Sequence, residues 1–150
     1  MFKKHLHIIF LVVATLLTLS LYFCDVYTVI EVGGVEYGEK YTSNLICLLL
    51  LIMTTIADLV IFALNKFGFV QARVCIFNAI MLAGLQLVLL WYYFTIHEAS
   101  VIFSPTILFP ALASFLNAVA GRRIMVTEIA YTAARKLGSS KSKASGNVRK

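Results

Sequence analysis

Charged residues are scarce in this chain: they make up 13% of its 150 residues, whereas 61% are hydrophobic. A soluble domain carries about 25% charged residues, so this composition indicates a protein embedded in lipid. Four apolar stretches use about half of the chain and leave no room for a separate soluble catalytic domain. These stretches, which we interpret as membrane spans, are residues 8–24, 44–64, 70–96 and 105–121.

Positive charge is almost absent from two of the segments between these stretches, residues 25–43 and 97–104. Of the 13 Lys and Arg residues only Lys40 lies there, whereas five of the seven acidic residues do. Positively charged flanks stay in the cytoplasm during insertion. The chain is therefore predicted to be an integral, all-α four-helix bundle of the inner membrane, with both termini in the cytoplasm.

The first apolar stretch lacks the small-residue pattern of a signal-peptide cleavage site. Phe23, rather than a small residue, precedes Cys24, so a lipoprotein site is not indicated either. We expect the stretch to remain as a membrane anchor. Cys24 and Cys47 both fall near the outer face, and the sequence leaves open whether they form a disulfide.

The first outer segment has the composition of a short β-hairpin. Residues 26–32 are rich in β-branched and aromatic side chains, and Gly33 and Gly34 suit a tight turn before residues 35–37. A two-stranded periplasmic hairpin between spans one and two is therefore predicted, whereas residues 97–104 are predicted to be a loop.

The last span begins with a helix start signal and is followed by a polar exit. Ser104 is the expected N-cap and Pro105 the first helical residue, whereas Pro110 lies deeper and predicts a kink. The helical pattern continues through a cytoplasmic exit helix, residues 122–137. Residues 138–150 have the composition of a disordered basic tail that binds anionic inner-leaflet lipid, which we favour over nucleic acid as its partner.

One acidic residue, Asp58, falls inside a span, where a charge is costly unless it faces protein. Polar residues at similar depth in the other spans predict an intramembrane cluster in the inner half of the bundle. Such a cluster is either a proton relay or ion site, or a structural cluster that fixes helix register. We favour the structural interpretation, because a relay usually needs several ionisable groups along a path. The predicted members are Asp58, Asn78, Asn117, Arg73 and Thr15.

Small residues recur along the last span at spacings of three, four and three. They are Ala111, Ser114, Ala118 and Gly121. Small side chains let membrane helices approach closely, so these positions are predicted to form a helix-packing seam.

No pattern in the sequence indicates catalysis. A nucleophile elbow, a phosphate-binding glycine loop and an HExxH helix are all lacking. His5 and His7 lie at the inner end of the first span and His97 on the outer side, so they cannot share a metal ion. We therefore expect no cofactor, no metal site and no enzymatic activity.

The stretch Gln71-x-Arg73-x-Cys75-x-x-Asn78 resembles a signature of an uncharacterised family of four-span membrane proteins from Bacteroidota, classified only as a domain of unknown function. Phe109-Pro110-Ala111 and the exit helix resemble the same family's last span, although residues 127–132 carry fewer charges than its pattern. The resemblance implies a bacterial inner membrane protein and supplies no activity.

The function expected from these patterns is that of a small accessory or interaction protein, with a membrane-protein partner or a second copy of itself. The first alternative is a small transporter or proton-coupled module that uses Asp58. The second alternative is a membrane-embedded enzyme, for which no reactive group of residues is visible.

Overall fold

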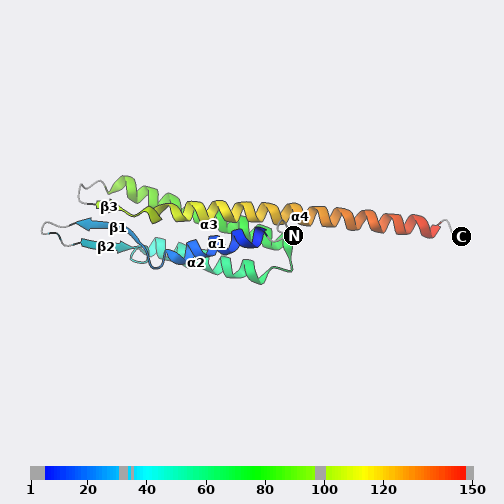
Figure 1. Ribbon diagram of the computed structural model, residues 1–150, viewed down its shortest axis with the longest axis horizontal. Helices are drawn as coiled ribbons and strands as arrows, with labels where there is room; N and C mark the ends of the chain where they lie inside the picture. The colour runs from blue at the N-terminus through cyan, green and yellow to red at the C-terminus, as the bar shows by residue number, and fades with distance from the viewer. Residues whose placement is uncertain (1–5, 31–33, 35, 97–100, 148–150) are drawn as a thin grey trace.

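The computed structural model describes residues 6–30, 34, 36–96 and 101–147, the last eleven by their backbone alone. The described residues form four α-helices, one 3₁₀ helix and a small sheet (Figure 1). The helices are α1 (Leu6–Ser20), α2 (Leu45–Ala63), α3 (Gly68–Thr95), the 3₁₀ helix η2 (Pro105–Leu108) and α4 (Phe109–Asn147). The strands are β1 (Asp25–Ile30), β2 (Glu36–Lys40) and β3 (Val101–Phe103).

The four α-helices pack side by side as an elongated bundle. Helix α4 packs most extensively against α3 and then against α1, and α2 contacts both α3 and α1. The sheet lies at one end of the bundle, which we call the sheet end (Figure 1). The turn between α2 and α3 lies at the opposite end, the turn end, and α4 runs on beyond it.

The sheet has three antiparallel strands in the order β2–β1–β3, with β1 in the centre. Thr28 of β1 pairs with Gly38 of β2 on one side and with Ile102 of β3 on the other. Gly34 has a φ of 79°, as a tight turn requires. The hairpin prediction is confirmed for β1 and β2. The loop prediction was wrong for residues 101–103, which form the third strand.

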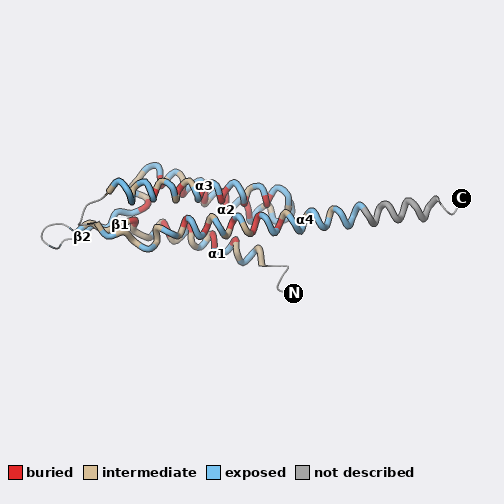
Figure 2. Tube along the Cα trace, turned by 90° about the horizontal axis from the view of Figure 1, so that it is seen from above, coloured by how far each residue is buried: buried red, intermediate tan, exposed pale blue. Residues whose placement is uncertain are grey.

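Buried residues occur along the length of the bundle (Figure 2). Their hydrophobic side chains form three clusters. At the sheet end, Tyr41 is buried together with Leu21 and Leu89. Ala14, Leu82 and Ala113 meet in the middle. Towards the turn end the third cluster contains Leu11, Ile61, Ala72, Cys75, Ala120 and Ile124.

The outside of the bundle is apolar as well. Large hydrophobic side chains that are more than half exposed occur on all four helices, among them Leu16, Leu59, Ile80, Leu87 and Phe115. Helices α2, α3 and α4 contain segments long and apolar enough to cross a membrane, whereas α1 is a shorter apolar helix of 15 residues. The helix within the first predicted span ends at Ser20, because residues 21–23 form turns and Asp25 begins β1.

The last span differs from its prediction at both ends. Ser104 accepts a hydrogen bond from the Thr106 N–H and Pro105 begins a helix, as expected, but that helix is the 3₁₀ helix η2. Pro110 is consequently the second residue of α4, in a first turn whose N–H groups have no partner within the helix, so the proline removes no hydrogen bond of that helix. The predicted disordered tail was wrong over residues 138–147, which continue α4, because adding a residue to an existing helix costs far less than starting one. Residues 148–150 lie outside the described part of the chain.

Candidate functional site

Each of the four α-helices contributes one buried polar side chain to a cluster inside the bundle. Asp58 of α2 is 2% exposed, and Thr18 of α1, Asn78 of α3 and Asn117 of α4 are fully buried. The Asp58 carboxyl group lies on the face of α2 that the sequence predicted to point inward. Cys47, Leu51, Thr54 and Asp58 on this face are all buried. A carboxyl group and two amides are thus enclosed by helices whose outer surfaces are apolar.

A short hydrogen bond joins two members of this polar cluster. The Asn78 Nδ2 atom donates to the Asp58 Oδ1 atom at 2.7 Å. The Thr18 hydroxyl and the Asn117 amide lie beside the same carboxyl group. The Thr18 hydroxyl, however, donates to its own helix, at the Ala14 carbonyl oxygen 3.0 Å away.

Within the described residues, four buried polar atoms of the cluster have no hydrogen-bond partner: Asp58 Oδ2, Asn78 Oδ1, Asn117 Nδ2 and Asn117 Oδ1. With Asp58 ionised, three of these atoms are acceptors and one is a donor. A proton on Asp58 Oδ2 turns that atom into a donor and gives two donors and two acceptors. The cluster can therefore take up one proton and balance its hydrogen-bonding groups in the same step.

The sequence predicted three of the cluster's residues, Asp58, Asn78 and Asn117, and misplaced two others. Thr15 is half-buried and donates to the Leu11 carbonyl oxygen, whereas the buried threonine is Thr18, which lies on the same face of α1 as Leu11 and Ala14. Arg73 is exposed. It lies about 140° around α3 from Asn78, on a different face, so it does not reach Asp58 as predicted.

Three of the four residues predicted for the packing seam of α4 contact α3. Gly121 is buried, and the Ser114 hydroxyl donates to the Ala79 carbonyl oxygen of α3 at 2.7 Å. Ala111 and Ala118 are exposed, although the Ala111 N–H still donates to the Gln86 Oε1 atom of α3 at 3.1 Å. The buried face of α4 instead follows Ala113, Asn117, Ala120 and Ile124.

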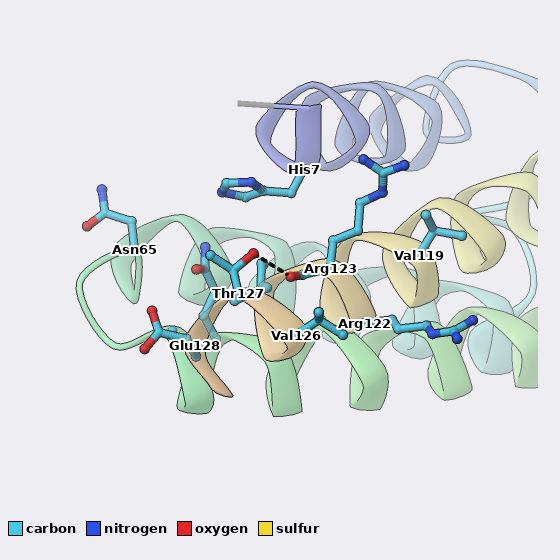
Figure 3. A pocket seen from close by; sticks show the side chains of 11 residues that line it. His7, Asn65, Val119, Arg122, Arg123, Val126, Thr127 and Glu128 are labelled. Atoms are coloured by element: carbon cyan, nitrogen blue, oxygen red, sulfur yellow. Dashed lines mark hydrogen bonds between the residues drawn. The ribbon is translucent and has the colours of Figure 1, made fainter. Parts of the chain in front are cut away.

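A second polar site lies at the turn end, where a cavity of about 560 Å³ opens between α1, α4 and the α2–α3 turn (Figure 3). We call it the turn-end pocket. Its lining combines charged, polar and apolar side chains: His7, Asn65, Gly68, Gln71, Val119, Arg122, Arg123, Ile124, Val126, Thr127 and Glu128. No sequence pattern predicted this site, because its residues come from three separate segments.

The local geometry of the turn-end pocket is fixed by contacts between elements. A Cβ atom on Gly68 would lie 2.3 Å from the Glu128 Oε1 atom, so the Glu128 side chain rests on the first residue of α3. Negative charge is favourable at a helix N-terminus. The Gln71 Nε2 atom donates to the Ile61 carbonyl oxygen at 3.1 Å, which ties α3 to α2.

The cysteines and acidic residues of the described segments form no cluster of three or more metal-binding side chains. Cys24, Cys47 and Cys75 are free thiols. The chain matches no protein-family model, and no curated protein or solved structure is detectably similar to it.

Proposed function

We propose that the protein is a multi-pass protein of the bacterial inner membrane, with four spans and both termini in the cytoplasm. The main support is the placement of polar and apolar side chains. A carboxyl group and two amides are buried inside the bundle, whereas large apolar side chains cover its outside. Helix α1 has 15 residues and extends about 22 Å, so it would cross together with the turn at residues 21–23. The charge distribution of the connecting segments and the resemblance to the Bacteroidota family support the same arrangement.

Reporter fusions test this topology. Fusions after Gly68 and after Lys150 should report the cytoplasm, and fusions after Gly34 and after Ser100 should report the periplasm. A periplasmic signal from the C-terminal fusion would rule out four spans with both termini inside.

We further propose that the protein acts as a small accessory or interaction subunit with no catalytic role. Helix α4 supports this proposal. It passes the turn end at Glu128 and continues to Asn147, about 30 Å beyond the bundle (Figure 1). A helix outside its own bundle is only marginally stable in water, so a projecting helix of this length favours a binding partner. Val126 and Ile129, three residues apart on one face, are 60% and 55% exposed and supply an apolar contact surface.

Photo-crosslinking in native membranes tests the interaction. A photoreactive residue in place of Ile129 should yield one discrete crosslinked protein, and a second copy of this chain is an acceptable product. A matched probe at Leu87, which is 67% exposed on the bundle itself, should yield mainly lipid adducts. Identical lipid products from both positions would contradict a partner at α4.

A proton-coupled membrane module is the second candidate function, and the unpartnered Oδ2 atom of Asp58 favours it. Asp58 lies next to the Asn117 amide, whose two polar atoms also lack partners within the described residues. Proton uptake and release at this carboxyl group would change the balance of donors and acceptors across α2, α3 and α4. A proton flux through vesicles that disappears in Asp58→Asn, with the bundle still folded, would support this candidate over the first.

A further inference from the structure

The turn-end pocket combines cationic side chains with a polar floor. Arg123 of α4 and His7 of α1 lie on the same side of the cavity, and Arg122 and Thr127 line it from α4 (Figure 3). The Thr127 hydroxyl donates to the Arg123 carbonyl oxygen at 2.9 Å. Asn65 and Gln71 add amide groups from the α2–α3 turn and α3.

The Arg123 guanidinium contacts an aromatic ring of α1 and points away from the pocket's acid, Glu128 (Figure 3). Its central carbon lies 5.5 Å from the centroid of the Phe10 ring of α1, within the range of a cation–π contact. Figure 3 shows Glu128 and the Arg123 guanidinium pointing to different sides, and Glu128 instead rests on Gly68. The pocket therefore presents a positioned positive charge to a ligand.

A second cavity, lined by both polar and apolar side chains, adjoins this pocket. It has a volume of about 400 Å³ and shares His7, Asn65 and Gln71 with the turn-end pocket. The rest of its lining is hydrocarbon from Ile8, Leu11 and Phe62. The second cavity therefore offers a hydrocarbon wall next to the polar residues that it shares with the turn-end pocket.

We propose that the turn-end pocket binds the phosphodiester headgroup of an anionic glycerophospholipid from the inner leaflet. Arg123 is the main phosphate contact, since a guanidinium can donate two parallel hydrogen bonds to phosphate oxygens. The start of an acyl chain lies against the hydrocarbon wall of the adjoining cavity, at Ile8, Leu11 and Phe62, which a free phosphate would leave uncovered. Basic pockets between membrane helices on the cytoplasmic side commonly bind anionic headgroups. The inference depends on the proposed topology, which places the turn end at the inner leaflet.

Native mass spectrometry of the purified full chain tests lipid binding. After addition of phosphatidylglycerol in detergent, the wild-type protein should retain one lipid, and Arg123→Gln should lower its apparent affinity about tenfold, equivalent to about 1.4 kcal/mol. Arg135→Gln is the matched control, because Arg135 is exposed on α4 away from the pocket, and it should retain lipid as the wild type does. Arg123→Lys should fall between the two, since it keeps the charge and loses the paired hydrogen bonds.

A parallel measurement separates a lipid from a free anion. Phosphatidylglycerol should raise the melting temperature of the wild-type protein and of Arg135→Gln, and inorganic phosphate at the same concentration should not. Equal lipid retention by Arg123→Gln and Arg135→Gln, or equal stabilisation by inorganic phosphate, would overturn the proposal. Lipid binding is measured on purified protein, whereas the reporter fusions and the crosslinking at Ile129 are measured in membranes. A negative lipid-binding result would therefore contradict the lipid site without contradicting the topology or the partner at α4.

Discussion

Gly121 of α4 lies directly against Cys75 of α3. A Cβ atom at position 121 would be 2.9 Å from the Cys75 Cβ atom and 3.1 Å from the Ala72 carbonyl oxygen. Both neighbours are fixed to the backbone of α3, so neither can move aside as the end of a long side chain could. The missing side chain at this position therefore sets how closely the two helices approach.

Gly121→Ala should destabilise the bundle by about 1–3 kcal/mol, because the added methyl group pushes α3 and α4 apart. This loss exceeds the gain of about 1 kcal/mol from better helix propensity. Unfolding titrations with sodium dodecyl sulfate in mixed micelles would measure it. Gly84→Ala is the matched control: a Cβ atom there would have no neighbour within 4 Å, so this variant should be as stable as the wild type or more so.

The difference in burial between two alanines of α4 gives a second prediction. Ala113 is fully buried, whereas Ala118 is exposed. Ala113→Leu should therefore lower the free energy of unfolding by about 1–3 kcal/mol through overpacking, and Ala118→Leu should leave it nearly unchanged. Equal unfolding curves for the two variants would show that α4 is rotated from the orientation in this structure.

The contrast between α2 and α4 shows what the sequence alone could predict. In α2, Thr54 and Asp58 mark one polar stripe in an otherwise apolar helix, so its inward face was recognisable. In α4, alanines lie on more than one face, and the helix packs against both α1 and α3. Residue size therefore could not select Ala113 over Ala118, and the buried Asn117 was the better guide to the inward face.

Long-range contacts account for most of what the sequence did not predict. Strand β3 has three residues, too few for a recognisable alternation, and it exists because Val101–Phe103 pair with β1, which is remote in sequence. The turn-end pocket likewise combines His7, Asn65 and Arg123 from separate segments. Local patterns carry no signal for either feature, because the contacts form only in the folded bundle.

Tyr41 gives a prediction about alkaline pH. Its side chain is 1% exposed and its hydroxyl is 3.2 Å from the Thr106 hydroxyl oxygen. Burial raises the pKa of Tyr41 from 10.0 to about 12, and the Thr106 hydrogen bond opposes this rise only in part. Since the folded state holds the phenolic proton more tightly, this contribution to stability is complete below pH 10 and is lost as the pH rises towards 12.

Absorbance at about 295 nm should show one tyrosine of the folded protein ionising near pH 12 that is missing in Tyr41→Phe. The variant should lose less stability than the wild type above pH 10, because it has no phenol to ionise there. Tyr37→Phe is the control, since Tyr37 is 58% exposed and its loss should leave the alkaline fall in stability in place. If Tyr41→Phe loses as much stability above pH 10 as the wild type does, groups other than Tyr41 cause that loss.

The polar cluster gives the last prediction, which separates its two interpretations. Asp58→Asn should be tolerated, because the new amide oxygen can still accept from Asn78 Nδ2 and its NH₂ group can donate to the unpartnered Asn117 Oδ1 atom. Asp58→Leu leaves the Asn78 donor buried without its acceptor, which should cost about 1–3 kcal/mol in unfolding titrations. If Asp58→Leu is as stable as the wild type, the cluster does not hold the helices in register. If Asp58→Asn keeps its stability yet loses the cellular phenotype or vesicle proton flux, the carboxyl group acts through its proton. The amide keeps the hydrogen bonds and removes only the titratable site, so this single variant distinguishes a structural cluster from a proton-coupled one.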